Sequence, residues 1–221
     1  MDGMYYAGMP RFHVAVDCMI FSVIDGKLHI LLVERDFEPE KGKLSLVGGF
    51  VMEKENVDEA AKRVLDELTG IRDAFILQIG AFGEVDRDPG ARVISVAYLV
   101  LLKQEDLEIN KNSGKVKWME LDMVPQLSFD HPEMIKKALS IMREKILNEA
   151  LAFYLLPELF TLTQLQHLVE SVTGRKLDKR NFRKRVLDLP GIYSTDLVDK
   201  QTSKRGAKLY RYNLETNKNI S

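Results

Sequence analysis

The segment Gly49 to Ile71 carries charged residues at a spacing that suits chemistry on a diphosphate. Positions 64, 67 and 68 are three and four residues apart, so they share one face of the helix that we predict here. Carboxylates gathered on such a face bind the divalent cations that neutralise a diphosphate and activate water. In this chain only Glu67 is acidic, because Val64 and Leu68 occupy the other two positions.

The spacing resembles the signature of the Nudix hydrolase family: Gly, five residues, Glu, seven residues, then Arg-Glu-apolar-x-Glu-Glu-x-Gly-apolar. The positions that agree are Gly49, Glu55, Arg63, Leu65, Glu67, Gly70 and Ile71. Val64 and Leu68 replace two glutamates of the signature. One helical carboxylate, even with Glu55, is a poor cage for Mg²⁺, which needs several oxygen ligands. We therefore expect a Nudix scaffold with no catalytic residue, metal or cofactor; the alternative is an ordinary amphipathic helix.

The composition is that of a globular protein, with 45% hydrophobic and 29% charged residues. No apolar run approaches the roughly 20 residues of a membrane span, and the N-terminus lacks a basic segment followed by an apolar one. We therefore expect a cytoplasmic protein with no membrane partner. Cys18 is alone, which excludes a disulfide framework and a cysteine-based zinc site.

The net charge of −1 hides a difference between two parts of the chain. From Ala150 onward there are 13 Lys and Arg against 7 Asp and Glu, whereas the preceding part has a net charge of −7. A basic C-terminal module attached to an acidic body favours a nucleic-acid reader. We therefore predict two domains, a domain with another function over residues 1–149, for which the family resemblance given below implies ligand sensing, and a DNA-binding domain over residues 150–221.

The order of predicted elements in the first domain indicates an α+β fold. Strands are expected at 12–23, 28–33, 74–82, 91–102 and 116–120, with Asp25-Gly26 turning the first hairpin. A helix capped by Asn56 and Glu59 ends at Gly70, and a second helix begins at Pro132. This order, and the Nudix resemblance, imply a mixed β-sheet sandwiched by helices.

The second domain has the order of a winged helix-turn-helix. Thr163 with Gln166 predicts a capping box for a helix that Gly174 ends, and Asp178 predicts the cap of a second helix. Strands at 192–198 and 207–212 form the wing. The second helix presents a basic outward face, and further cations lie at the wing; the predicted DNA-binding residues are Lys179, Arg180, Asn181, Arg183, Lys184, Lys204, Arg205 and Lys208. The alternative is a merely solvated charged face.

A Nudix-like domain followed by this winged helix resembles the Nudix-related transcriptional regulators known as NrtR. Five segments, LSLVGGFV, AAKRVLDELTG, GEVDRDPGARVISVAY, FDHPEM and KLDKRNFRKRV, are more narrowly similar to the Bacteroidetes branch of arabinose-responsive repressors, AraR. The resemblance implies a homodimer that reads palindromic double-stranded DNA and senses a small molecule, here a sugar, most simply L-arabinose.

The resemblance also implies where the ligand binds: beside the Nudix helix, the loop from Phe82 to Arg92, and Phe129-Asp130-His131. A neutral pentose needs hydrogen-bond acceptors and an aromatic surface. The predicted ligand-binding residues are Phe50, Glu67, Asp86, Arg87, Asp88, Asp130 and His131. The alternatives are a plain turn at 86–89 and a helix cap at 130–132.

Two other functions stay open at this point. The chain is a hydrolase of ADP-ribose or a related compound if Glu53, Glu55, Asp66 or Asp130 supplies the base and the metal ligands. It is instead a repressor linked to NAD metabolism if it binds ADP-ribose without cleaving it.

Overall fold

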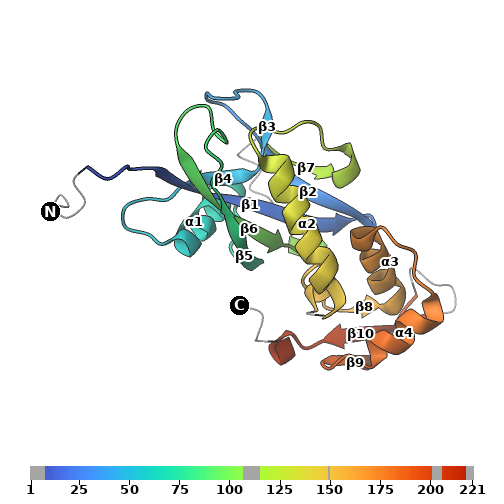
Figure 1. Ribbon diagram of the computed structural model, residues 1–221. Coiled ribbons are helices and arrows are strands. Elements are labelled where there is room, and N and C mark those ends of the chain that lie inside the picture. Colours follow the sequence, from blue (N-terminus) through green and yellow to red (C-terminus); the bar gives the residue numbers. More distant parts are fainter. Residues whose placement is uncertain (1–7, 107–114, 149, 201–205, 218–221) are drawn as a thin grey trace.

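The computed structural model describes residues 8–106, 115–148, 150–200 and 206–217 (Figure 1). Within them, one mixed sheet has seven strands: β1 (His13–Ile24), β2 (Lys27–Glu34), β3 (Leu44–Ser45), β4 (Val47–Phe50), β5 (Phe75–Phe82), β6 (Val93–Leu101) and β7 (Val116–Glu120). Strand β1 is central, antiparallel to β2 and β4 and parallel to β6. Asp25 and Gly26 form the predicted hairpin turn, both with positive φ.

Helices α1 (Val57–Thr69) and α2 (His131–Asn148) cover opposite faces of this sheet (Figure 1). Successive residues of β1 point to opposite faces, so Cys18 packs in the α1 cluster and Met19 in the α2 cluster. The predicted sheet sandwiched by helices is therefore confirmed. The predicted limits of α1 are also correct, because Asn56 forms the capping box with Glu59 and Gly70 ends the helix with a positive φ.

The C-terminal region has the predicted order of helix, turn, helix and hairpin. Its elements are η5 (Leu151–Tyr154), β8 (Phe160–Thr161), α3 (Leu162–Thr173), α4 (Lys179–Leu187), β9 (Ile192–Asp199) and β10 (Ala207–Tyr212). Short 3-10 turns also lie at η2 (Gln104–Asp106), η4 (Leu121–Met123) and η6 (Leu214–Asn217). Strand β8 was not predicted, and it pairs with β10.

The predicted capping residue of α3 was wrong. Thr161, not Thr163, accepts from the backbone N–H of Gln164 at 3.1 Å, and the side chain of Gln164 accepts from the backbone N–H of Thr161. The helix therefore begins two residues earlier than the predicted cap implied. The other two predictions hold: Asp178 caps α4, and Gly174 ends α3.

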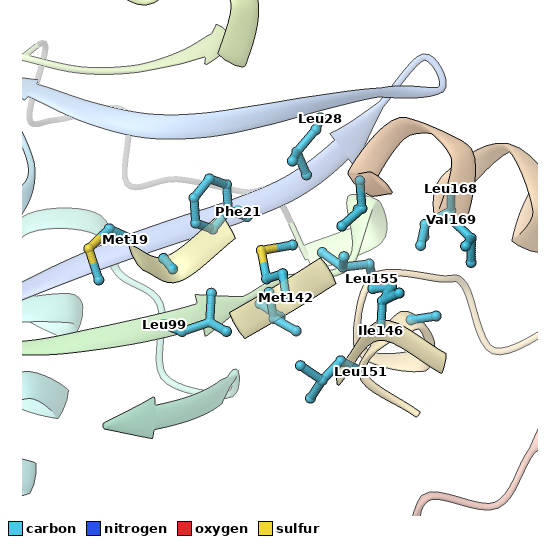
Figure 2. Close-up of a cluster of buried hydrophobic side chains, with 14 of the residues drawn as sticks. Met19, Phe21, Leu28, Leu99, Met142, Ile146, Leu151, Leu155, Leu168 and Val169 are labelled. Carbon is cyan, nitrogen blue, oxygen red and sulfur yellow. The ribbon is translucent and has the colours of Figure 1, made fainter. Parts of the chain in front are cut away.

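The apolar core on the α2 face continues into the winged helix. Figure 2 shows Met19 and Phe21 of the sheet, Met142 and Ile146 of α2, and Leu168 of α3 in one cluster. The cluster also includes Phe182 of α4. The proposed boundary between residues 149 and 150 thus falls inside continuous packing. No helix among the described residues has the length and apolar character needed to cross a membrane.

Candidate ligand site and nucleic-acid interface

Three charged residues of the Nudix signature meet around Arg63. Its Nε and Nη2 donate to the two carboxylate oxygens of Glu55 at 2.8 and 2.6 Å, and its Nη1 donates to Glu67 at 3.0 Å. Nη2 also donates to the carbonyl oxygen of Phe50 at 2.9 Å. The hydrogen bond from Arg63 lowers the pKa of Glu55 to about 2. Glu55 is therefore ionised at neutral pH and already paired with a cation from the chain itself.

The two altered signature positions are apolar contacts. Val64 is buried in the core beneath α1, and Leu68 is half-buried at its edge. Neither side chain has an oxygen to offer a metal ion. No group of three or more His, Cys, Asp or Glu in the described part of the chain is placed to hold a metal ion. The residues present at this helix therefore do not fit the Mg²⁺ cluster that the Nudix family implies.

Gly48 and Gly49 of β4 lie between this helix and a second, buried group of charges. A Cβ atom on Gly49 would lie 2.9 Å from Cγ2 of Val64, and a Cβ atom on Gly48 would collide with the carboxylate of Asp17. Real Cβ atoms do not approach other atoms so closely, so each glycine permits close packing on one side of the strand. The backbone of β4 thus joins the Arg63 network to the charges around Asp17.

Arg87 is the centre of this buried group. Its side chain is 3% exposed, and it donates to the two carboxylate oxygens of Asp130 at 2.9 and 2.7 Å and to Asp17 at 3.5 Å. Burial alone lowers the pKa of Arg87, but the hydrogen bond with Asp130 and the charge of Asp17 raise it above its ordinary value. Two predicted ligand contacts, Arg87 and Asp130, therefore bind each other and tie the β5–β6 loop to the start of α2.

His131 belongs to the same group. Its Nδ1 accepts from the backbone N–H of Leu46 at 3.2 Å, and its Nε2 lies 3.6 Å from Asp17. Burial lowers the pKa of His131, so the ring is neutral at pH 7 with its proton on Nε2, facing Asp17. His131 is thus one of the residues that hold β1, the β3–β4 segment and α2 together.

The other four predicted ligand residues lie outside this buried group. Phe50 is 48% exposed and its ring lies 5.5 Å from that of His13. Glu67 and Asp86 are exposed, and Asp88 accepts from the backbone N–H of Gly90 at 2.7 Å, as the predicted turn requires. The set therefore divides into an exposed or half-buried part and a buried part.

Two members of the buried group were missed from the sequence. Ser95 of β6 donates to Asp17 at 2.6 Å, and the Asp17 carboxylate receives Arg87 as well. A lone carboxylate within the apolar run of β1 was the available signal, because a buried charge needs a partner. Arg35, also missed, lies over the rings of Phe37 and Phe129 at 4.5 and 4.7 Å from their centroids.

The second helix of the winged helix, α4, presents its basic residues to solvent. Phe182 and Val186 are buried, and they leave Lys179, Arg180, Arg183 and Lys184 exposed. Lys208 is exposed on β10. Lys204 and Arg205 lie outside the described residues. With Asn181, which is also exposed, six of the eight predicted DNA contacts thus lie on the surface of this domain.

Asn181 faces a different surface. It lines a groove between α4 and α2 together with Arg185, whose Nη2 donates to Asn148 at 2.8 Å. This side of α4 is directed toward the Nudix domain. The basic run of α4 therefore divides between a solvent-facing set and a set at the domain junction.

Two family models match the chain, one in each region. The NUDIX domain model matches residues 11–138, and the model of the NrtR DNA-binding winged helix domain matches residues 152–212. Together they account for both regions that the fold distinguishes.

The relatives agree with this division. The chain is 35% identical over 214 residues to the ADPR responsive transcriptional repressor NtrR of Acinetobacter baylyi, covering 93% of this chain and 84% of that protein. It is 34% identical over 123 residues, 56% of this chain and 70% of the relative, to an ADP-ribose pyrophosphatase of Methanocaldococcus jannaschii.

Solved structures of one further relative, Shewanella oneidensis NrtR, are also similar. Its complex with a 27mer DNA superposes with a TM-score of 0.83 at 30% identity, covering 92% of this chain and 95% of that one. Its NUDIX domain with ADP ribose gives a TM-score of 0.55 at 27% identity, covering 64% and 99%. The narrower resemblance to AraR has no support from these relatives. The chain belongs to the Nudix-related transcriptional regulators of the NrtR family.

Proposed function

We propose that the protein is a transcriptional repressor whose winged helix binds an operator in double-stranded DNA and whose Nudix domain senses ADP-ribose. The observation that carries the proposal is the pairing of an altered Nudix helix with an exposed basic helix. Val64 and Leu68 remove metal ligands from α1, while α4 keeps five exposed cations beside a wing. A domain that binds a nucleotide derivative without a catalytic metal suits a sensor better than an enzyme.

ADP-ribose is the proposed ligand for two reasons, and it replaces arabinose. The Acinetobacter baylyi relative is ADPR responsive, and the NUDIX domain of Shewanella oneidensis NrtR forms a complex with ADP ribose. The chain also offers groups that suit a diphosphate joined to an aromatic base. Phe50 is an exposed ring, and Arg35 is a cation whose described contacts are two rings and the carbonyl oxygen of Pro39.

The buried group around Arg87 supports this site instead of contacting the ligand. Glu67, Asp86, Asp88 and Phe50 remain the proposed ligand contacts, whereas Arg87, Asp130 and His131 hold the β5–β6 loop and the start of α2 in place. Ligand binding that favours one arrangement of α2 over another would be felt at the winged helix, because α2 packs on α3. ADP-ribose releases the operator if it prefers the arrangement that does not fit DNA.

We also propose that the active form is a homodimer on a palindromic operator. Two winged helices on a two-fold axis read half-sites separated by whole helical turns, about 10 bp each. A small change in their separation then weakens both half-sites at once. Sedimentation of the protein with and without operator DNA measures the stoichiometry, and one chain per operator would contradict the dimer.

A gel-shift experiment tests the function directly. The full-length protein is mixed with duplexes from the promoter region of its own gene neighbourhood, and ADP-ribose, L-arabinose or D-xylose is added. We expect a specific complex that ADP-ribose dissociates and that the two sugars leave intact. Dissociation by L-arabinose instead would support a sugar as the ligand. An absence of any specific complex would contradict the proposed repressor function.

Hydrolysis of ADP-ribose is the second candidate, and the similarity to the Methanocaldococcus jannaschii pyrophosphatase favours it. The test is the release of AMP and ribose phosphate from ADP-ribose with Mg²⁺. We expect no turnover, because the carboxylate of Glu55 is paired with Arg63 and positions 64 and 68 are apolar. Turnover that a Glu67→Ala variant abolishes would assign an enzyme.

A further inference from the structure

The junction between the two domains contains a groove that the proposed function does not use. It has a volume of about 580 Å³ and lies between the C-terminal half of α2 and helices α3 and α4. Its apolar lining comes from all three helices, with Leu147 of α2, Val169 of α3 and Phe182 of α4. A volume of this size suits a small organic molecule.

Three arginines also line the groove. One comes from α2, one from α4 and one from the turn between α3 and α4. Arg143 of α2 donates from Nε to the carbonyl oxygen of Val172 at 3.1 Å, and Arg185 of α4 donates to the side-chain oxygen of Asn148. Arg175, between α3 and α4, has no hydrogen bond or ion pair to any described residue. Hydrogen bonds to neutral oxygens orient the first two guanidinium groups without neutralising them.

The carboxylates that line the groove do not balance these cations. Asp178 uses Oδ1 to accept from the backbone N–H of Asn181 at 2.8 Å, and the side chain of Glu144 forms no ion pair within the described residues. None of the three arginines lies within ion-pair distance of a carboxylate in the described part of the chain. The guanidinium group is planar and presents paired N–H donors, which fit a phosphate or a carboxylate.

We propose that this groove binds a small organic anion, with its phosphate or carboxylate group among Arg143, Arg175 and Arg185 and its apolar body on Leu147, Val169 and Phe182. The occupant would contact α2 of the Nudix domain and α4 of the winged helix together. It is therefore a second ligand site, separate from the proposed ADP-ribose site, and its position at the junction couples it to the orientation of α4. Only this last consequence depends on the proposed function.

The test uses the full-length protein and two probes that differ in their apolar part, phenyl phosphate and inorganic phosphate, in isothermal titration calorimetry without DNA. Phenyl phosphate should bind at least about tenfold more tightly, because only it reaches the apolar lining. The double variant Arg143→Ala/Arg175→Ala should lose at least about tenfold in phenyl phosphate affinity, since it removes two charge-assisted contacts. Lys137→Ala removes an exposed cation of α2 that does not line the groove, and it should leave the affinity unchanged.

Two results would overturn the proposal: no phenyl phosphate binding to the wild-type protein at millimolar concentration, or equal binding to the double variant. Urea denaturation of each variant confirms that it is folded. A gel shift in phosphate-free buffer tests whether the arginines contact the DNA backbone instead of a small anion. If the double variant loses operator affinity and the wild-type protein does not bind phenyl phosphate, the arginines contact the DNA backbone and the small-anion site is rejected. Failure of the repressor proposal would leave the calorimetric result standing.

Discussion

The two faces of the seven-stranded sheet differ in what lies beyond the helix that covers them. On the α1 face, the apolar cluster is formed by residues of the Nudix region alone. On the α2 face, the cluster continues through Leu151 and Leu155 into α3 and α4 (Figure 2). A change in packing on the α2 face can therefore reach α4 directly, whereas a change at α1 must first cross the sheet.

The charged networks of the two faces differ in how far they are buried. The Arg63 network on the α1 face is partly in solvent, with side-chain exposures of 27% for Arg63, 60% for Glu67 and 13% for Glu55. The Arg87 network beside α2 is buried, with 3% exposure for Arg87. Exposed ion pairs contribute little to stability, whereas a buried charge that loses its partner is costly. We therefore expect loss of the Arg63 ion pairs to be tolerated better than loss of the Arg87 network.

The largest effect should come from Arg87→Ala, which leaves the carboxylates of Asp17 and Asp130 in the interior without their cation. We expect the free energy of unfolding to fall by about 3 kcal/mol or more, measured by urea denaturation. The matched change on the other face, Arg63→Ala, should cost clearly less, because Glu67 is 60% exposed and Glu55 keeps the hydrogen bond that it accepts from the backbone N–H of Met52.

The comparison of these two variants decides whether burial sets the difference. Equal losses for Arg87→Ala and Arg63→Ala would mean that both networks are equally structural. An Arg87→Ala/Asp130→Ala double variant should recover part of the loss, because it removes one of the two unpaired charges.

The next largest effect should come from Gly49→Ala, which places a Cβ atom 2.9 Å from Cγ2 of Val64. Forcing extra atoms into a packed core costs about 1 to 3 kcal/mol. Val64→Ala creates room at the same point, so the double variant should lose less than the sum of the two single variants. Simple additivity in urea denaturation would show that Gly49 and Val64 do not press on each other.

The sequence was most informative where local chemistry decides the structure. Asn56, Glu59 and Gly70 predicted α1 because caps act within a few residues. The cap of α3 was misplaced because Thr161 with Gln164 and Thr163 with Gln166 both fit the same pattern, and pairing of Thr161 with β10 decided between them. Such pairing joins residues far apart in sequence.

The candidate site shows the same limit more strongly. Arg87 and Asp130 were both placed near the ligand by resemblance, but their separation by 43 residues hid the fact that they bind each other. The strand context of Asp17 contained the only local sign of this network. Residue types and spacing can therefore indicate a site, but they do not separate the residues that contact a ligand from those that support them.

A smaller effect is expected on the DNA-binding side, where the two sets of α4 residues can be compared. Arg183→Ala removes an exposed cation and should weaken operator binding about tenfold, leaving ADP-ribose affinity unchanged. If Arg183 contacts a phosphate, the slope of affinity against salt concentration should also fall by about one. Arg185→Ala removes a side chain bound to Asn148 and should weaken the operator complex less. Gel shifts at several salt concentrations give both values, and an equal loss for the two variants would contradict the division of the helix.

The smallest effect concerns the pH dependence of the free energy of unfolding, which should differ between the two networks. Burial lowers the pKa of His131 below its ordinary value of 6.5, so below that pH the unfolded chain binds a proton that the folded chain does not. The stability associated with His131 is therefore present above pH 6.5 and decreases as the pH falls, by at most about 1.4 kcal/mol per pH unit. Glu55, whose pKa is lowered from 4.5 to about 2 by Arg63, contributes above pH 4.5 and loses its contribution as the pH falls toward 2. We expect urea denaturation between pH 8 and 3 to show two separate effects. His131→Gln should reduce the pH dependence of the free energy of unfolding only in the upper part of this range, and Glu55→Gln should reduce it only in the lower part. If the free energy of unfolding of the His131→Gln variant changes with pH between 6.5 and 5 as it does in the wild-type protein, the His131 ring must be protonated in the folded wild-type protein. That result would contradict the neutral, buried state of His131.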